Sequence, residues 1–210
     1  MPHEVGTIER LHTILYHAWI ADTRPDGLGV SKQMSMGKVI RLFTADIGDR
    51  TRTNMLLTGQ LVADRTMIID KVGLYCSFSN KQFYTDFFRC ARMTLNIGDK
   101  PMLIAPASYF ASDDKQVAPE TIKVEKLYDP PPFTHKYGYC GFIKMAGDRT
   151  KDKEAPRGIA VLPRMGFEVL FEFDDDNFVD AMQRIERGAE FASYAQIMVM
   201  LEGTGTRELL

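Results

Sequence analysis

Residues 66–78 read TMIIDKVGLYCSF, and this stretch decides the fold class. It is too long and too rich in β-branched and aromatic side chains to be a turn. Alternate side chains fall on one side of an extended chain, namely Ile68, Val72, Leu74, Cys76 and Phe78. That is the two-residue period of a strand with one buried face, so we predict a long strand here.

A helix is predicted directly after this strand. Ser79 and Gln82 have the spacing of a capping box, which predicts that the helix begins at Ser79. Phe83, Phe87 and Cys90 then follow at i, i+4 and i+7, so the helix has one apolar stripe. The next strand, residues 93–97, alternates between apolar and polar side chains. This order predicts a β-sheet with a helix packed on its surface.

The rest of the chain repeats the signals of short strands and turns. Further strands are predicted over residues 39–44, 53–61, 102–104, 121–127, 137–145, 159–162, 167–173 and 194–201, with a turn at residues 203–205. Residues 174–176 are three aspartates that predict the N-terminus of another helix, and Gly188 its end. Such a chain favours an antiparallel two-sheet β-sandwich with short helices in the connections over alternating βαβ units.

The N-terminal segment has a different period. Its apolar residues are spaced like one face of a helix over residues 7–20, and they are Ile8, Leu11, Ile14, Leu15, Ala18 and Trp19. A stretch rich in glycine, serine and methionine follows. We therefore predict an N-terminal amphipathic helix and flexible arm over residues 1–36, and a sandwich domain over residues 37–210.

Three partners are open for this predicted helix: its own sheet, a neighbouring subunit or inner layer, and a membrane surface. The candidate interface residues are Ile8, Leu11, Leu15 and Trp19. Under the second alternative, deleting residues 1–36 leaves a folded protein that cannot assemble.

The length, net charge and composition of the chain limit the class of protein. A chain of 210 residues without an evident linker favours a single large domain. The formal net charge of −2 argues against a protein that coats nucleic acid, because binding phosphates needs a basic face. There is neither an apolar run of roughly 18 residues nor a signal-peptide pattern. The three cysteines lack a CxxC spacing, which fits a reducing compartment. We expect a soluble protein made in the cytoplasm.

Motifs that carry chemistry are scarce. The histidines are His3, His12, His17 and His135, and none lies on a confidently predicted strand, so a metal site is not expected. Residues 174–176 could hold Ca²⁺, but a solvated turn before a helix is favoured. Glu168 and Glu172 share one strand face, yet roughly 13 Å separates positions four apart, too far for a glycosidase pair. We expect no enzyme, no cofactor and no metal.

Five segments carry a likeness to a known family. They are residues 42–44, 53–61, 67–78 with Gly73, 97–101, and 199–203 with Arg207. In their pattern and order the chain resembles the jelly-roll coat proteins of tailless icosahedral viruses, particularly phages with small coat subunits. The resemblance implies a single jelly roll of eight strands in two sheets.

The resemblance also implies a function. A coat subunit assembles with copies of itself into an icosahedral shell and resides in the virion after synthesis in the host cytoplasm. Many such coats hold the genome with a basic N-terminal arm, whereas this N-terminus carries little net charge. Direct genome binding is therefore not expected. The partners implied for the N-terminal helix are other virion proteins or an internal membrane.

A second class of function stays open, a non-catalytic β-sandwich module on a virion or cell surface that binds a glycan or a receptor. Its mark would be exposed aromatic residues grouped in one patch. The candidates are Tyr109, Phe110, Tyr128, Phe133 and Tyr137. An enzyme would instead have a buried carboxylate pair in a deep pocket.

Overall fold

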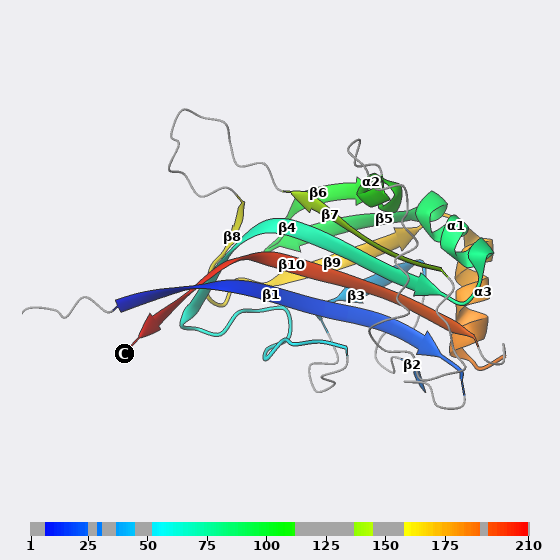
Figure 1. Ribbon diagram of the computed structural model, residues 1–210, viewed down its shortest axis with the longest axis horizontal. Coiled ribbons are helices and arrows are strands. Elements are labelled where there is room, and N and C mark those ends of the chain that lie inside the picture. The colour runs from blue at the N-terminus through cyan, green and yellow to red at the C-terminus, as the bar shows by residue number, and fades with distance from the viewer. Residues whose placement is uncertain are drawn as a thin grey trace, which may run out of the picture.

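Two layers of strands, with helices gathered at one end, make up the protein (Figure 1). This is a computed structural model of the chain, and it describes residues 7–24, 29–30, 37–44, 52–111, 137–144, 158–189 and 193–209. The predicted strand over residues 121–127 lies outside these ranges. Among the described residues, no helix is long and apolar enough to cross a lipid bilayer.

The strands form two antiparallel sheets. The larger sheet contains β2 (Gly29–Val30), β1 (Thr7–Asp22), β10 (Tyr194–Leu209), β4 (Arg65–Phe78) and β7 (Tyr137–Lys144) in that order, and β8 (Ile159–Val161) also pairs with β4. The smaller sheet has the order β3 (Val39–Leu42), β9 (Phe167–Phe173), β5 (Ala91–Ile97) and β6 (Lys100–Pro106). The predicted antiparallel two-sheet sandwich is confirmed.

Strand pairing identifies the topology. With the short β2 and β8 set aside, β1 pairs with β10, β3 with β9, β4 with β7, and β5 with β6. Each pair is nested inside the one before, so the chain is a long hairpin rolled into two facing sheets. This arrangement is a jelly roll.

Strand β4 lies in the middle of the larger sheet, as its length and pattern predicted. Val72, Leu74, Cys76 and Phe78 are buried between the sheets. Ile68 is only partly buried, and Met67 and Ile69 face the core in its place. The register of β4 against β10 shifts by one residue between Glu202 and Gly203, and this irregularity reverses the alternation.

The predicted N-terminal helix is wrong, because residues 7–22 form β1 and pair with β10 along their whole length. The helical spacing arose because both faces of the strand are covered near its end. Trp19 and Ala21 face the core between the sheets, while Ala18 and Ile20 pack with Tyr194 on the opposite face. Apolar residues on both faces of a strand can imitate a helical stripe.

Trp19 also links β1 to the helical end of the molecule. Its indole Nε1 donates a hydrogen bond of 3.2 Å to Glu186 Oε1 at the end of α3 (Asp176–Glu186). The division predicted between residues 36 and 37 stays a prediction, although β1 belongs to the larger sheet.

The turn predicted at residues 203–205 is also wrong, since β10 continues through it to Leu209. Glycine marks close packing here instead. A Cβ on Gly203 would overlap the carbonyl oxygen of Ile68, and one on Gly205 would overlap the Thr13 hydroxyl. Glycine is therefore needed at both positions for neighbouring strands to approach.

The predicted helices that follow β4 and β9 are present with small shifts. α1 (Lys81–Cys90) begins two residues after the predicted start at Ser79, because its cap is Asn80, whose side chain accepts a hydrogen bond of 2.7 Å from Gln82 N. α3 buries a stripe of Phe178, Met182 and Ile185, and Gly188 follows its end, as predicted, with a φ of 69°. A short helix, α2 (Ala107–Ala111), follows β6.

Trp19→Ala is expected to lower the free energy of unfolding by about 3–5 kcal/mol, because it empties a large site in a closely packed core. Leu11→Ala is the matched control on the same strand face, and since Leu11 is 45% exposed it should change stability little. Urea denaturation measures both.

The pairing of β1 with β10 changes the outcome expected when residues 1–36 are deleted. Removing residues 1–36 takes away β1 and exposes one side of β10, so we now expect an unfolded or aggregated product. A soluble deletion product with native circular dichroism, or equal effects of the two alanine substitutions, would contradict this account of β1.

Candidate functional site

The carboxylates considered for glycoside hydrolysis are held in ion pairs. Glu168 Oε2 lies 3.0 Å from Arg41 NH1, and Glu172 Oε2 lies 2.6 Å from Arg92 NH2. Both glutamates alternate with the buried phenylalanines of β9, so they are on the outer face of the smaller sheet. Both ion pairs lie on this charged outer face, and Glu172 also borders a pocket of about 300 Å³ together with Arg92 and Lys38.

The described histidines do not form a metal site. His12 and His17 are five positions apart on β1 and so point to opposite faces of the sheet. His17 Nδ1 accepts a hydrogen bond of 2.8 Å from Phe43 N, while His12 Nε2 lies 3.4 Å from Glu202 Oε1. His3 and His135 are outside the described residues. Within the ranges that are described, no cluster of three potential metal ligands occurs.

The three aspartates at residues 174–176 serve the start of α3. Asp175 is its N-cap and accepts hydrogen bonds from Asn177 N and Phe178 N. An ion pair of 2.6 Å joins Asp175 to Arg89, and one of 2.9 Å joins Asp176 to Lys38. The interpretation as a helix-capping turn is confirmed.

Among the described residues, Cys90, Tyr194 and Lys71 have raised pKa values, and each shift favours the protonated form, which is not nucleophilic. Burial, followed by the charges of nearby aspartates, raises the pKa of the Cys90 thiol to about 12. Burial also raises the pKa of Tyr194. A hydrogen bond to Glu202 raises the pKa of Lys71, whose Nζ lies 2.6 Å from the carboxylate. A thiol held protonated at neutral pH is a poor nucleophile.

The candidate interface residues are only partly brought together. Leu11, Leu15 and Trp19 share the inner face of β1, since they are four positions apart on a strand. Leu11 is half exposed, Leu15 is partly buried against the core, and Trp19 is fully buried. The side chain of Ile8 lies outside those described. The role of these four as interface residues remains a prediction. Trp19 is fully buried within its own chain.

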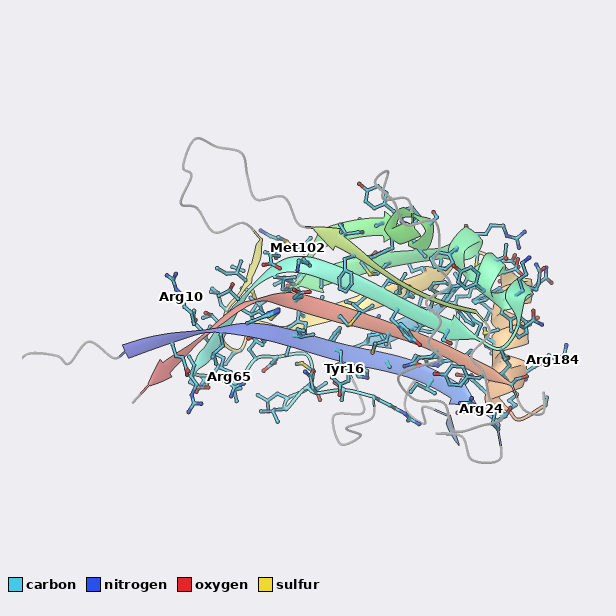
Figure 2. All side chains as sticks on the ribbon, viewed as in Figure 1. Arg10, Tyr16, Arg24, Arg65, Met102 and Arg184 are labelled. Carbon is cyan, nitrogen blue, oxygen red and sulfur yellow. The ribbon has the colours of Figure 1, made fainter. Side chains whose placement is uncertain are left out.

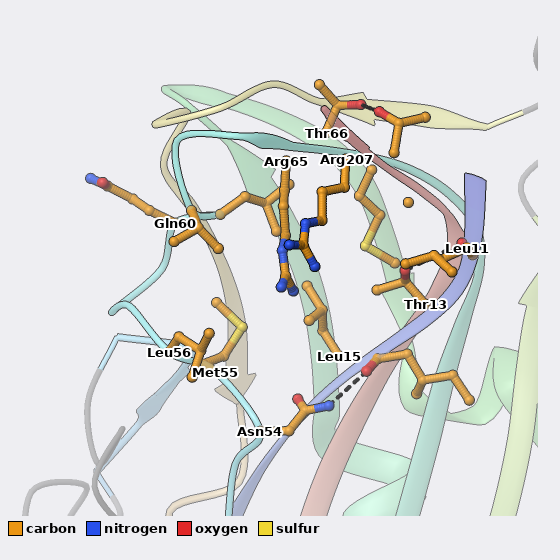
Figure 3. Close-up of a pocket in the computed structure, with 16 residues that line it drawn as sticks. Leu11, Thr13, Leu15, Asn54, Met55, Leu56, Gln60, Arg65, Thr66 and Arg207 are labelled. Atoms are coloured by element: carbon orange, nitrogen blue, oxygen red, sulfur yellow. Dashed lines mark hydrogen bonds between the residues drawn. The ribbon is translucent and has the colours of Figure 1, made fainter. Parts of the chain in front are cut away.

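Two of them, Leu11 and Leu15, border a pocket that the sequence did not predict. Its volume is about 260 Å³, and it lies where β1, β10 and the start of β4 meet the segment over residues 54–62. The apolar walls come from Leu11, Leu15, Met55, Leu61 and Met67 (Figure 3). The side chains of Arg65 and Arg207 extend side by side into it.

No motif could have revealed this pocket. Arg65 and Arg207 are 142 positions apart in the sequence, and the register of β4 against β10 makes them direct cross-strand neighbours. Only knowledge of that register brings them together. The apolar walls look like ordinary strand and loop residues until the strands are assembled.

Large apolar side chains are exposed on one edge of the smaller sheet. Met102 and Ile104 point outward from β6 and are 45% and 61% exposed (Figure 2 labels Met102). Tyr109 on α2 is 58% exposed, whereas its neighbour Phe110 is buried. In the aromatic patch predicted for a glycan-binding module, Tyr128 and Phe133 lie outside the described residues, as does the side chain of Tyr137.

Comparison with known proteins adds a distant similarity. No protein-family model matches the chain, and no curated protein matches it. A solved structure titled "Crystal structure of PBCV-1 VP54 fitted into a cryo-EM reconstruction of the virophage Sputnik" aligns with a TM-score of 0.38 and 7% sequence identity. The alignment covers 97% of this chain and 44% of that one, so this chain spans less than half of its length. At this level the similarity establishes neither family nor function.

The raised pKa of Cys90 predicts a loss of stability in alkali. Below its ordinary pKa of 9.0 the thiol is protonated in both states, and above it only the unfolded chain releases the proton until about pH 12. The free energy of unfolding should therefore fall as pH rises through this window. Cys90→Ala should show a smaller fall in urea titrations at each pH, and an identical slope in both proteins would refute the assignment.

Proposed function

We propose that this protein is a coat subunit of an icosahedral virion and assembles with copies of itself. The observation that carries the proposal is the apolar outer face of the edge strand β6. Met102, Ile104 and Pro106 point outward there and are exposed. Edge strands of proteins that remain monomeric are usually protected by charges or by covering segments.

The neighbouring strands make the contrast clear. On the outer face of β5, Arg92 and Thr94 pair in register with Pro106 and Ile104 of β6, and β9 carries charged Glu172 beside Arg92. The outer face of β5 is thus charged and polar, whereas that of β6 beside it is apolar; elsewhere on this face Leu170 of β9 and Val39 of β3 are also apolar. A contiguous apolar strip at a sheet edge is typical of a contact surface.

The jelly roll is compatible with this role but does not carry it, because one fold serves many functions. Closed shells arise when the same contacts repeat between identical subunits. The sequence resemblance to coat proteins of phages with small subunits supports a bacteriophage virion as the place of assembly. A net charge of −2 supports a coat subunit that does not itself bind the genome. Contact through an N-terminal helix is withdrawn, because that segment is β1.

Ile104→Asp is expected to reduce assembly strongly, because it places a charge in the centre of the apolar strip. Size-exclusion chromatography with light scattering, followed by electron microscopy, should find oligomers or shells for the unsubstituted protein and mostly single subunits for the variant. Since Ile104 is 61% exposed, the free energy of unfolding of the Ile104→Asp variant should differ little from that of the unsubstituted protein.

Ala160→Asp is the matched control, since it adds the same charge at an exposed position of β8. It should assemble normally. A protein that stays a single subunit at every concentration, or an Ile104→Asp variant that assembles like the control, would overturn the proposal.

A further inference from the structure

We propose that the pocket between β1, β10, β4 and residues 54–62 binds a carboxylate that carries a short apolar chain. This site is separate from the β6 edge and does not depend on the assembly role. Three features of the described residues support it: the facing arginines, the incomplete balance of their charge, and the apolar walls.

The strand register directs both arginines into the pocket. Arg65 and Arg207 are direct partners in the pairing of β4 with β10, two residues beyond Met67 and Gly205. Met67 is buried in the core, so this set of alternate positions faces inward. Figure 3 shows the two side chains lying next to one another and pointing towards Leu15. They thus present two guanidinium groups to the same space.

The two positive charges are poorly balanced by the protein. Like charges directly opposite one another on neighbouring strands are destabilising. Arg207 Nε lies 3.8 Å from Asp64 Oδ2, and the side chains of both residues are about half exposed. Arg65 forms no ion pair with any residue that the structure describes. Glu9 is the register partner of Arg207 on β1, yet no ion pair joins the two described residues.

A bound carboxylate would relieve this repulsion. Guanidinium groups hold carboxylates through paired, charge-assisted hydrogen bonds, and these are stronger at a site partly shielded from water. The arginines are the only charged residues among those that line the described pocket. The site therefore prefers an anion at one end.

The other pocket walls favour a ligand in which the anionic group carries an apolar chain. Of the two amides that line the pocket, Asn54 is already used: Nδ2 donates to Ile14 O at 2.7 Å, and Oδ1 accepts from Tyr16 N at 2.9 Å. The other amide, Gln60, extends away from the arginines in Figure 3. Gly205 contributes no side chain between Leu11 and Met67, and the Thr13 hydroxyl occupies the position that a Cβ would take there. Exposed Leu56 also lines the pocket. An alkyl chain would contact these walls, whereas a bare inorganic anion would leave them hydrated.

Isothermal titration calorimetry of the full chain with decanoate tests the proposal near neutral pH. One decanoate is expected to bind per chain. Decanol has the chain without the charge, and acetate and inorganic phosphate have charge without the chain, so each should bind at least about tenfold more weakly. Equal binding of decanol or phosphate would overturn the proposed ligand class, and absence of decanoate binding would overturn the site.

Arg65→Gln and Arg207→Gln should each weaken decanoate binding by about tenfold or more, since each removes a charge-assisted contact. The matched control is Arg10→Gln: Arg10 pairs with Thr206 and alternates with Leu11, so it lies on the other face of the sheet. A control that weakens binding as much as Arg65→Gln would indicate diffuse electrostatic attraction and refute the site.

Folding and binding can be separated in these variants. Because the two arginines repel one another, Arg65→Gln should be at least as stable as the unsubstituted protein in urea. Arg65→Lys keeps the charge but loses the paired geometry. Its affinity for decanoate should therefore lie between that of the unsubstituted protein and that of Arg65→Gln. An affinity for Arg65→Lys equal to that of Arg65→Gln, with both variants folded, would rule out charge recognition. Decanoate binding by Ile104→Asp subunits would distinguish this site from the assembly contact.

Discussion

The hydrogen-bonded ladder on both sides of β10 is the constraint on which the rest of the molecule depends. β10 pairs with β1 over sixteen residues on one side and with β4 on the other. These three strands supply Trp19, Leu74 and Ile197 to the core. They also bring Arg65 beside Arg207 and close one wall of the pocket. The smaller sheet and α3 then pack against a surface that this ladder has already defined.

The sequence predicted elements well wherever one face alone was buried. The strand at Phe167–Phe173 was found because its two-residue period is unambiguous, and α3 was found because three aspartates mark its beginning and Gly188 follows its end. It failed where an element is covered on both sides, as at Trp19 and Ile20 of β1. It also failed at Gly203, where a glycine needed for close packing looked like a turn. In each case the information lay in a distant partner strand rather than in the local pattern.

The candidate site was less predictable than the fold. The exposed residues of β6 were part of a predicted strand, but the sequence did not indicate which alternate set would face solvent. The pocket depends entirely on the register between strands. A one-residue slip of β10 against β4 would move Arg207 to the other face of the sheet, away from Leu15. The small irregularity at Gly203 therefore determines both the core of β4 and the chemistry at its beginning.

Nested pairing has a consequence for how the chain reaches its native state. Thr23 and Ser193 are hydrogen-bonded although 170 positions separate them, and β1 acquires its partner only when β10 is available. Loops of that size close slowly, and proteins dominated by distant contacts fold over milliseconds to seconds. During synthesis β1 leaves the ribosome long before β10, with Trp19 and its apolar neighbours uncovered. Early chains are thus candidates for chaperone binding, and crowding of nascent chains would favour aggregation.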